Sequence, residues 1–175
     1  MKPIVIALIL ILNLAGCTNR SYAPPGEIVS DMAWAKRVTS RRDDFRRTTE
    51  YKGATFEGTH HSAFLRSIKA DAFPQEEGMV LYILFELREW EFLDTTYSSA
   101  GDRLPTSVVD REVGYCGRNG CSLAEHVAVH VTREYLLTKI HGDGLLIKVA
   151  GKRGEQLVQV LPNYIAGFLA SVPRP

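Results

Sequence analysis

The chain has 175 residues, of which 21 are Lys or Arg and 20 are Asp or Glu, and its formal net charge at pH 7 is +1. A chain this close to neutral has no global field that would recruit nucleic acid, so an anionic partner would need a local basic patch. The length suits one domain built around a single core.

The first residues have the pattern of an export signal. Lys2 supplies positive charge, and the apolar run over residues 4–12 is shorter than the about 20 residues that span a bilayer. The stretch Leu14-Ala15-Gly16-Cys17 resembles the lipobox of bacterial lipoproteins, in which the cysteine is acylated and becomes the mature N-terminus. The resemblance implies a signal peptide over residues 1–16 and a lipid anchor at Cys17. A plain secretory signal is the alternative.

The same resemblance implies a cellular address. In inner-membrane lipoproteins of enterobacteria an aspartate commonly follows the acylated cysteine, whereas here the residue is Thr18. We therefore expect a lipid anchor in the outer membrane, with the protein facing the periplasm. The inner membrane is the alternative.

Residues 17–43 are expected to form a tether and an N-terminal segment. Residues 18–26 are polar and carry Pro24-Pro25-Gly26, which indicates a tether. Residues 27–38 have apolar side chains at helical spacing and predict a helix or an irregular segment. Six Lys and Arg residues then occur within positions 36–47. Two aspartates interrupt this run, which favours a solvated face over a grip on lipid phosphates.

From residue 44 to residue 175 the chain has the texture of a mainly β domain. Short segments rich in Thr, Tyr, Phe, Val and Ile alternate with turns of Gly, Pro, Asp and Asn. Strands are expected over residues 45–51, 54–57, 63–70, 79–85, 90–94, 104–113, 126–131, 145–149 and 156–161. A helix competes over 79–85, where we prefer a central strand covered on both faces because the neighbouring strands need a sheet to join.

Two short helices are expected among these strands. One covers residues 133–140 and is capped by Thr132, and the other covers residues 163–170 after Pro162. Together these elements predict an antiparallel β-sandwich of about seven to nine strands with two short helices. A partly open β-barrel is the alternative.

Two cysteines remain besides Cys17. Cys116 and Cys121 enclose Gly117-Arg118-Asn119-Gly120, a turn that can bring the two α-carbons within bridging distance. Export would place them in an oxidising compartment, where thiols tend to pair. We therefore predict a disulfide between Cys116 and Cys121, ahead of free thiols, a redox dithiol or a zinc site.

The polar residues provide no recognisable catalytic arrangement. His126 and His130 alternate with valines, and a strand would separate their rings by about 13 Å, too far for one zinc ion. Glu86, Glu89 and Glu91 lie along one segment and are explained as solvated strand edges. The chain contains no G-x-S-x-G elbow, no P-loop and no dinucleotide fingerprint. We therefore assign no catalytic residue, no metal site and no cofactor.

Four aromatic residues near the mid-chain turns form a possible recognition patch, namely Trp90, Phe92, Tyr97 and Tyr115. Aromatic rings are favoured anchors at interfaces, although core packing is the competing explanation. With the anchor and tether, they predict a binding or structural lipoprotein that presents loops or a sheet edge to another protein or polymer of the envelope. The alternatives are an inhibitor of an envelope-attacking enzyme and an envelope hydrolase with an unrecognised site.

Overall fold

A computed structural model describes residues 30–118 and 120–174, without the side chains of residues 74–77. The predicted signal peptide, Cys17 and residues 17–29 lie outside the described residues. The elements, in chain order, are α1 (Asp31–Ala35), β1 (Thr39–Asp43), β2 (Thr48–Lys52), β3 (Phe56–Glu57), β4 (His61–Ala70), β5 (Phe73–Leu87), β6 (Thr95–Ser98), β7 (Arg103–Leu104), β8 (Thr106–Gly117), β9 (Gly120–Val131), α2 (Arg133–Leu137), β10 (Leu145–Ala150), β11 (Glu155–Val160) and α3 (Pro162–Ser171).

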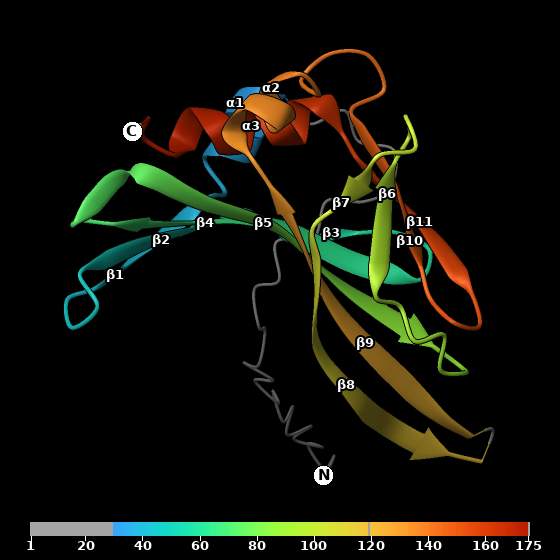
Figure 1. Ribbon diagram of the computed structural model, residues 1–175. Helices are drawn as coiled ribbons and strands as arrows, with labels where there is room; N and C mark the ends of the chain where they lie inside the picture. Colours follow the sequence, from blue (N-terminus) through green and yellow to red (C-terminus); the bar gives the residue numbers. More distant parts are fainter. Residues whose placement is uncertain (1–29, 119, 175) are drawn as a thin grey trace, which may run out of the picture.

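These strands form two antiparallel sheets, which confirms the predicted sandwich. The larger sheet has seven strands in the order β1-β2-β4-β5-β9-β8, with β3 paired to β4, and the smaller has four in the order β11-β10-β6-β7. The three helices lie together over one side of the larger sheet, beside the smaller sheet (Figure 1). Strands β1 and β6 and the two-residue strand β7 are additions to the strands expected from the sequence.

One core fills the space between the larger sheet and the layer above it. On β5, the inward side chains of Met79, Leu81, Ile83 and Phe85 are at most 2% exposed. The preference for a strand over a helix in this segment is therefore confirmed. The expectation that both faces are covered is wrong, because the alternate residues Val80, Tyr82 and Leu84 stay half-buried on the face away from the helices.

The helical layer includes residues that the sequence assigns to the N-terminal segment. Helix α1 packs against α3, where the rings of Trp34 and Tyr164 meet edge to face with centroids 5.0 Å apart. A side chain at Gly167 would overlap Trp34 and the backbone of α1, so this glycine permits the close approach of the two helices. Strand β1 pairs with β2, and residues 30–43 therefore contribute one helix and one strand to the fold.

Tyr164 connects α3 to the larger sheet. Its side chain is buried, and its hydroxyl donates to the carbonyl oxygen of Ala54 at 2.8 Å and accepts from the N–H of Leu65 at 3.0 Å. Burial raises the pKa of this hydroxyl, so it remains neutral. Gly53 has no side chain that could collide with the hydroxyl, which leaves room for this contact.

The cap predicted for the second helix is present. The hydroxyl of Thr132 accepts a hydrogen bond from the N–H of Tyr135 at 3.1 Å and so satisfies one free donor at the start of α2. Helix α2 ends at Leu137, earlier than expected. Among the described residues, no helix is long and apolar enough to cross a membrane.

Candidate functional site

Residues 90–94 form an irregular loop between β5 and β6, and the prediction of a strand over this segment is wrong. Phe92 has a φ angle of 58°, a left-handed conformation that is costly for a side chain other than glycine. Such a conformation persists only where surrounding contacts hold it in place. The contacts of this loop must therefore stabilise the left-handed conformation of Phe92.

A buried carboxylate holds the backbone of the loop. Glu125 lies on the inward face of β9 with 0% of its surface exposed. Its Oε1 atom accepts from the N–H groups of Glu91 at 2.8 Å and Phe92 at 2.9 Å, and Oε2 accepts from that of Leu93 at 2.8 Å. Hydrogen bonds to a charged acceptor are strong, and together they offset the cost of burying the charge.

Arg111 supplies the opposite charge. It stands directly across from Glu125 in the pairing of β8 with β9. Its Nε atom lies 3.2 Å from Glu125 Oε2, and its Nη2 donates to the carbonyl oxygen of Leu93 at 3.3 Å. The ion pair and the loop thus form one hydrogen-bonded network.

The smaller sheet holds the other side of the loop. The N–H of Arg153 donates to the carbonyl oxygen of Glu91 at 3.1 Å, and the N–H of Asp94 donates to that of Ala150 at 3.0 Å. The side-chain amide of Gln156 donates to the carboxylate of Glu91 at 2.9 Å. The loop is therefore fastened to both sheets, although it contains no regular structure.

The ring of Phe92 is surrounded by cations. The guanidinium carbon atoms of Arg111 and Arg153 lie 5.4 and 5.5 Å from its centroid, and Lys152 Nζ lies 6.0 Å away. The ring of Trp90 lies 6.5 Å from that of Phe92. We call these five residues the Phe92 patch.

The charge of the Phe92 patch is only partly compensated. Arg111 is paired with Glu125, whereas the exposed residues Lys152 and Arg153 form no ion pair within the described part of the chain. Cations near an aromatic face gain a modest attraction from it, but the ring removes none of their positive charge. The patch therefore presents two cations that no ion pair neutralises in the described part of the chain.

The structure brings together only two of the four predicted aromatic residues. Trp90 and Phe92 are neighbours, whereas Tyr97 lies on β6 opposite Lys148 and Tyr115 lies near the tip of the β8–β9 hairpin. No ring contact between described residues links either tyrosine to the other two rings. The sequence reasoning missed Arg111, Glu125, Lys152 and Arg153. A signal existed only for Glu125, which extends the inward alternation of Val127 and Val129.

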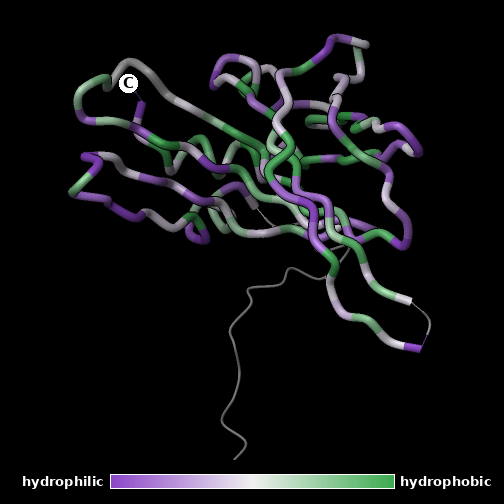
Figure 2. Tube along the Cα trace, turned by 60° about the horizontal axis from the view of Figure 1, so that its bottom comes forward, coloured by the Kyte–Doolittle hydropathy of each residue, from purple (hydrophilic) through white to green (hydrophobic). Residues whose placement is uncertain are grey.

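The hairpin formed by β8 and β9 projects beyond the rest of the domain (Figure 2). The predicted disulfide between Cys116 and Cys121 is present, and the two residues face each other in the strand register with α-carbons 3.9 Å apart. Tyr115 beside this bridge is 85% exposed. The hairpin therefore presents a covalently closed end with an aromatic side chain facing solvent.

A groove of about 710 Å³ lies between the hairpin and the loop; it is lined by His60, Glu86, Leu87, Arg88, Glu91, Gly120, Cys121, Ser122 and Gln156. Several of its polar groups are engaged in ordinary structural contacts. The carboxylate of Glu91 accepts from Gln156, and the hydroxyl of Ser122 donates to the carbonyl oxygen of Tyr115 at 3.4 Å. Within the described residues, no hydrogen bond joins Ser122 or His60 to a carboxylate.

The face of the larger sheet away from the helices carries a row of contacts across five strands. Lys52 Nζ lies 4.2 Å from the centroid of Phe64, whose ring stacks on Tyr82 at 5.1 Å. The Tyr82 hydroxyl lies 2.7 Å from His126 Nδ1, and His126 Nε2 lies 3.2 Å from a carboxylate oxygen of Glu112. His126 thus points away from the core, as the alternation with valines predicts.

His130 is also on this outer face, where its Nε2 lies 3.0 Å from the hydroxyl of Ser107. Across the described ranges 30–118 and 120–174, no group of three His, Cys, Asp or Glu residues is placed to hold a metal ion. No family model, no curated protein and no solved structure matches this chain.

Proposed function

We propose that this protein is a lipid-anchored binding or structural lipoprotein, acylated at Cys17, that presents the Phe92 patch to an anionic component of the bacterial envelope. The observation that carries the proposal is the fastening of loop 90–94 by the buried carboxylate of Glu125. This network holds Phe92 in a costly conformation, and strained residues cluster at functional sites.

The chemistry of the patch indicates the charge of the partner. Lys152 and Arg153 offer two exposed cations, and Trp90 and Phe92 offer aromatic surface beside them. Arginine forms directional, charge-assisted hydrogen bonds with carboxylates and phosphates. Because the loop is already ordered, binding loses little conformational entropy. An acidic polymer or an acidic protein surface fits these features.

The arrangement of the chain suits a protein that binds while anchored. The described chain begins at Ser30, next to the helical layer, whereas the tip of the β8–β9 hairpin points away from the helices (Figure 1). Residues 17–29 could extend over at most roughly 45 Å, at about 3.5 Å per residue. A lipid at Cys17 would thus leave the hairpin and the Phe92 patch accessible from the periplasm. We assign the anchor to the outer membrane, with the inner membrane as the alternative.

A second candidate function is inhibition of an envelope-attacking enzyme. The observation that favours it is the closed hairpin end, where the disulfide fixes the strands and Tyr115 is exposed. An inhibitor inserts a rigid loop into an active site, and this hairpin has suitable shape and rigidity. Inhibition would require Tyr115, whereas the main proposal requires Lys152 and Arg153.

Affinity capture from envelopes after mild crosslinking tests the main proposal. The variant Lys152→Glu/Arg153→Glu should recover the partner at least tenfold less efficiently than the wild type, because both exposed cations are reversed. The matched control Lys36→Glu/Arg41→Glu reverses two exposed cations, one just after α1 and one on β1, and should recover the partner normally. Equal recovery by both double variants would contradict the proposal. Turnover of a peptidoglycan or ester substrate without any captured partner would favour the hydrolase instead.

The anchor has its own test. Replacing Cys17 by Ser removes the thiol that would carry the lipid, so detergent partitioning and metabolic lipid labelling should both be lost. A variant that partitions like the wild type would rule out acylation at Cys17.

A further inference from the structure

Two neighbouring hairpin turns of the larger sheet expose phenylalanine side chains. Phe45 lies in the turn between β1 and β2 and is 103% exposed, and Phe73 lies at the start of β5, after the turn from β4, and is 61% exposed. The two turns lie side by side, far from the tip of the β8–β9 hairpin (Figure 1). We call Phe45, Phe73, Arg46 and Arg47 the phenylalanine tip.

Hydrogen bonds from one arginine fasten the two turns to each other. Arg42 Nη1 and Nη2 donate to the two carboxylate oxygens of Asp71 at 3.2 and 2.6 Å, and Arg42 Nε donates to Asp44 at 2.9 Å. The N–H of Asp71 also donates to the carbonyl oxygen of Arg47 at 2.9 Å. A two-point contact between a guanidinium and a carboxylate has a defined geometry. The two phenylalanine rings are therefore presented together, at one end of the sheet.

The aspartates that interrupt the basic run are engaged by its arginines. Asp44 pairs with Arg42, and Asp43 accepts from the N–H of Arg46 at 3.0 Å and lies 3.8 Å from its Nε. Arg47 has no ion pair in the described part of the chain. With the carboxylate at the second turn, three arginines balance three aspartates over residues 42–47 and 71. Attraction between opposite charges is therefore not the main force available to this tip.

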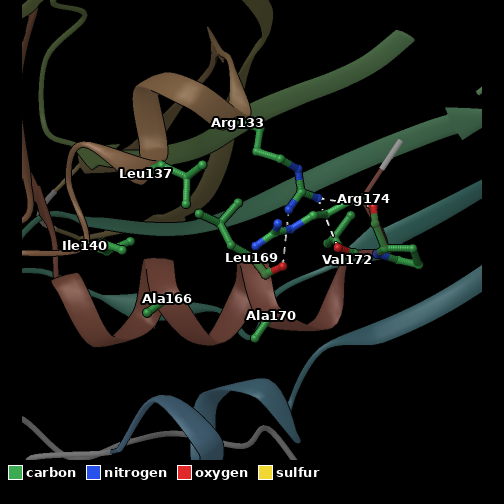
Figure 3. A pocket seen from close by; sticks show the side chains of 9 residues that line it. Arg133, Leu137, Ile140, Ala166, Leu169, Ala170, Val172 and Arg174 are labelled. Carbon is green, nitrogen blue, oxygen red and sulfur yellow. Dashed lines mark hydrogen bonds between the residues drawn. The ribbon is translucent and has the colours of Figure 1, made fainter. Parts of the chain in front are cut away.

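The phenylalanine rings protrude, whereas the nearby helical layer offers a hollow. That hollow, of about 400 Å³, lies between α2 and α3, and the guanidinium of Arg133 in it already donates to the carbonyl oxygens of Leu169 and Val172 (Figure 3). A protruding ring needs a partner that closes around it. The boundary between lipid head groups and acyl chains does so, and it accepts Phe beside cationic side chains.

The predicted anchor would keep the tip close to such a boundary. The described chain begins at Ser30, and Phe45 follows fifteen residues later. Residues 17–29 extend over at most roughly 45 Å, so a lipid at Cys17 would hold Ser30 within that distance of the bilayer. Because the domain is tethered, its second contact with the bilayer is effectively intramolecular, and even weak insertion is well populated.

We propose that Phe45 and Phe73 insert into the head-group region of the phospholipid bilayer that carries the anchor, while Arg46 and Arg47 bind lipid phosphates. This inference rests on the acylation of Cys17 proposed above. Strand β5 runs from the phenylalanine tip to the segment before loop 90–94 and separates them by up to roughly 50 Å, at about 3.3 Å per residue. Insertion of the tip would therefore leave the Phe92 patch free to face the periplasm.

Photocrosslinking of the intact lipoprotein in phospholipid nanodiscs tests this inference. The probe is phosphatidylethanolamine with a diazirine high in one acyl chain, and the readout is the set of lipid-modified peptides. Labelling should concentrate in residues 43–48 and 70–74. Phe45→Ser should reduce it at least fivefold, and the fold should be retained because this side chain is fully exposed. The matched control Tyr115→Ser removes an aromatic ring that is 85% exposed at the far hairpin and should label like the wild type.

The charged residues and the anchor are tested with the same probe. Arg46→Glu/Arg47→Glu should reduce labelling several-fold, because the reversed charges repel lipid phosphates. Cys17→Ser should label more weakly, but at the same two turns. Equal labelling of the wild type and Cys17→Ser at these turns would contradict the anchor and leave the insertion supported. Equal labelling of the wild type and Phe45→Ser, or labelling concentrated outside the two turns, would overturn the insertion.

Discussion

The two ends of the larger sheet are each fastened by one buried polar side chain, but the chemistry differs. At the helical end, the neutral hydroxyl of Tyr164 joins two backbone segments and is surrounded by aromatic packing from Trp34 and Phe56. At the hairpin end, the charged carboxylate of Glu125 holds three N–H groups and Arg111. The hydroxyl links a helix to the sheet, whereas the carboxylate fixes the backbone of an irregular loop whose Leu93 side chain is buried in the core.

The largest loss of stability is expected from removing the carboxylate of Glu125. Glu125→Ala leaves Arg111 and three N–H groups without their acceptor, and breaking a buried ion pair costs about 3–5 kcal/mol. Urea unfolding measures the loss of stability, and capture of the envelope partner should fall with it. The control Glu112→Ala removes an exposed carboxylate from the same hairpin and should cost less than about 1 kcal/mol. Similar losses in the two variants would show that the buried carboxylate of Glu125 holds the hairpin end no more firmly than an exposed one.

Removing the hydroxyl of Tyr164 should destabilise the domain less and should leave the Phe92 patch intact. Tyr164→Phe keeps the ring but leaves the N–H of Leu65 and the carbonyl of Ala54 without this hydroxyl. We expect a loss of about 2–4 kcal/mol, because a buried group left unpaired costs about 1–3 kcal/mol and Ala54 is only half-buried. Partner capture by the folded variant should equal that of the wild type. A loss of capture at full folding would mean that the two ends are coupled.

The disulfide should contribute less to stability than either of these side chains, because it closes a short turn. Cys116→Ser/Cys121→Ser should lower stability by about 2 kcal/mol by the chain-entropy estimate and Tm by roughly 2–8 °C, while the domain stays folded. Differential scanning calorimetry gives both values. A variant that fails to fold would show that the hairpin end depends on its covalent bridge rather than on Glu125.

The smallest effect on stability is expected from His61, which lies between the two ends at the start of β4. Burial and the neighbouring charge of His60 lower the pKa of His61 below its ordinary value of 6.5. As the pH falls through 6.5, the unfolded chain binds a proton that the folded chain excludes, so stability should decrease toward the lower pKa of the folded state. His61→Gln should flatten this dependence in urea titrations between pH 7.5 and 5.5. An unchanged slope would assign the dependence to other groups.

The sequence predicts the elements whose signals are local. The alternation over 126–131 places both histidines outside the core, Thr132 caps α2, and the spacing of Cys116 and Cys121 allows their bridge. Loop 90–94 was predicted as a strand because its apolar residues alternate, yet its conformation is decided by a carboxylate on a distant strand. Long-range contacts of this kind leave no trace in local periodicity.

The candidate site is only half visible in the sequence for the same reason. Trp90 and Phe92 are identifiable as aromatic residues beside a turn. Arg111 comes from β8, and Lys152 and Arg153 come from the turn between β10 and β11. Only the pairing of β8 with β9 and the docking of the smaller sheet bring these cations to one ring.

The central claim, that Glu125 preorganises the Phe92 patch, is tested most directly by hydrogen exchange of the amides of Glu91, Phe92 and Leu93. These three N–H groups bond to Glu125 rather than to a neighbouring strand. In the wild type, residue-resolved NMR should show them exchanging far more slowly than the amides of the exposed turn 141–143. In a folded Glu125→Ala variant they should exchange at the rate of that turn. Fast exchange of all three amides in the wild type would contradict the account.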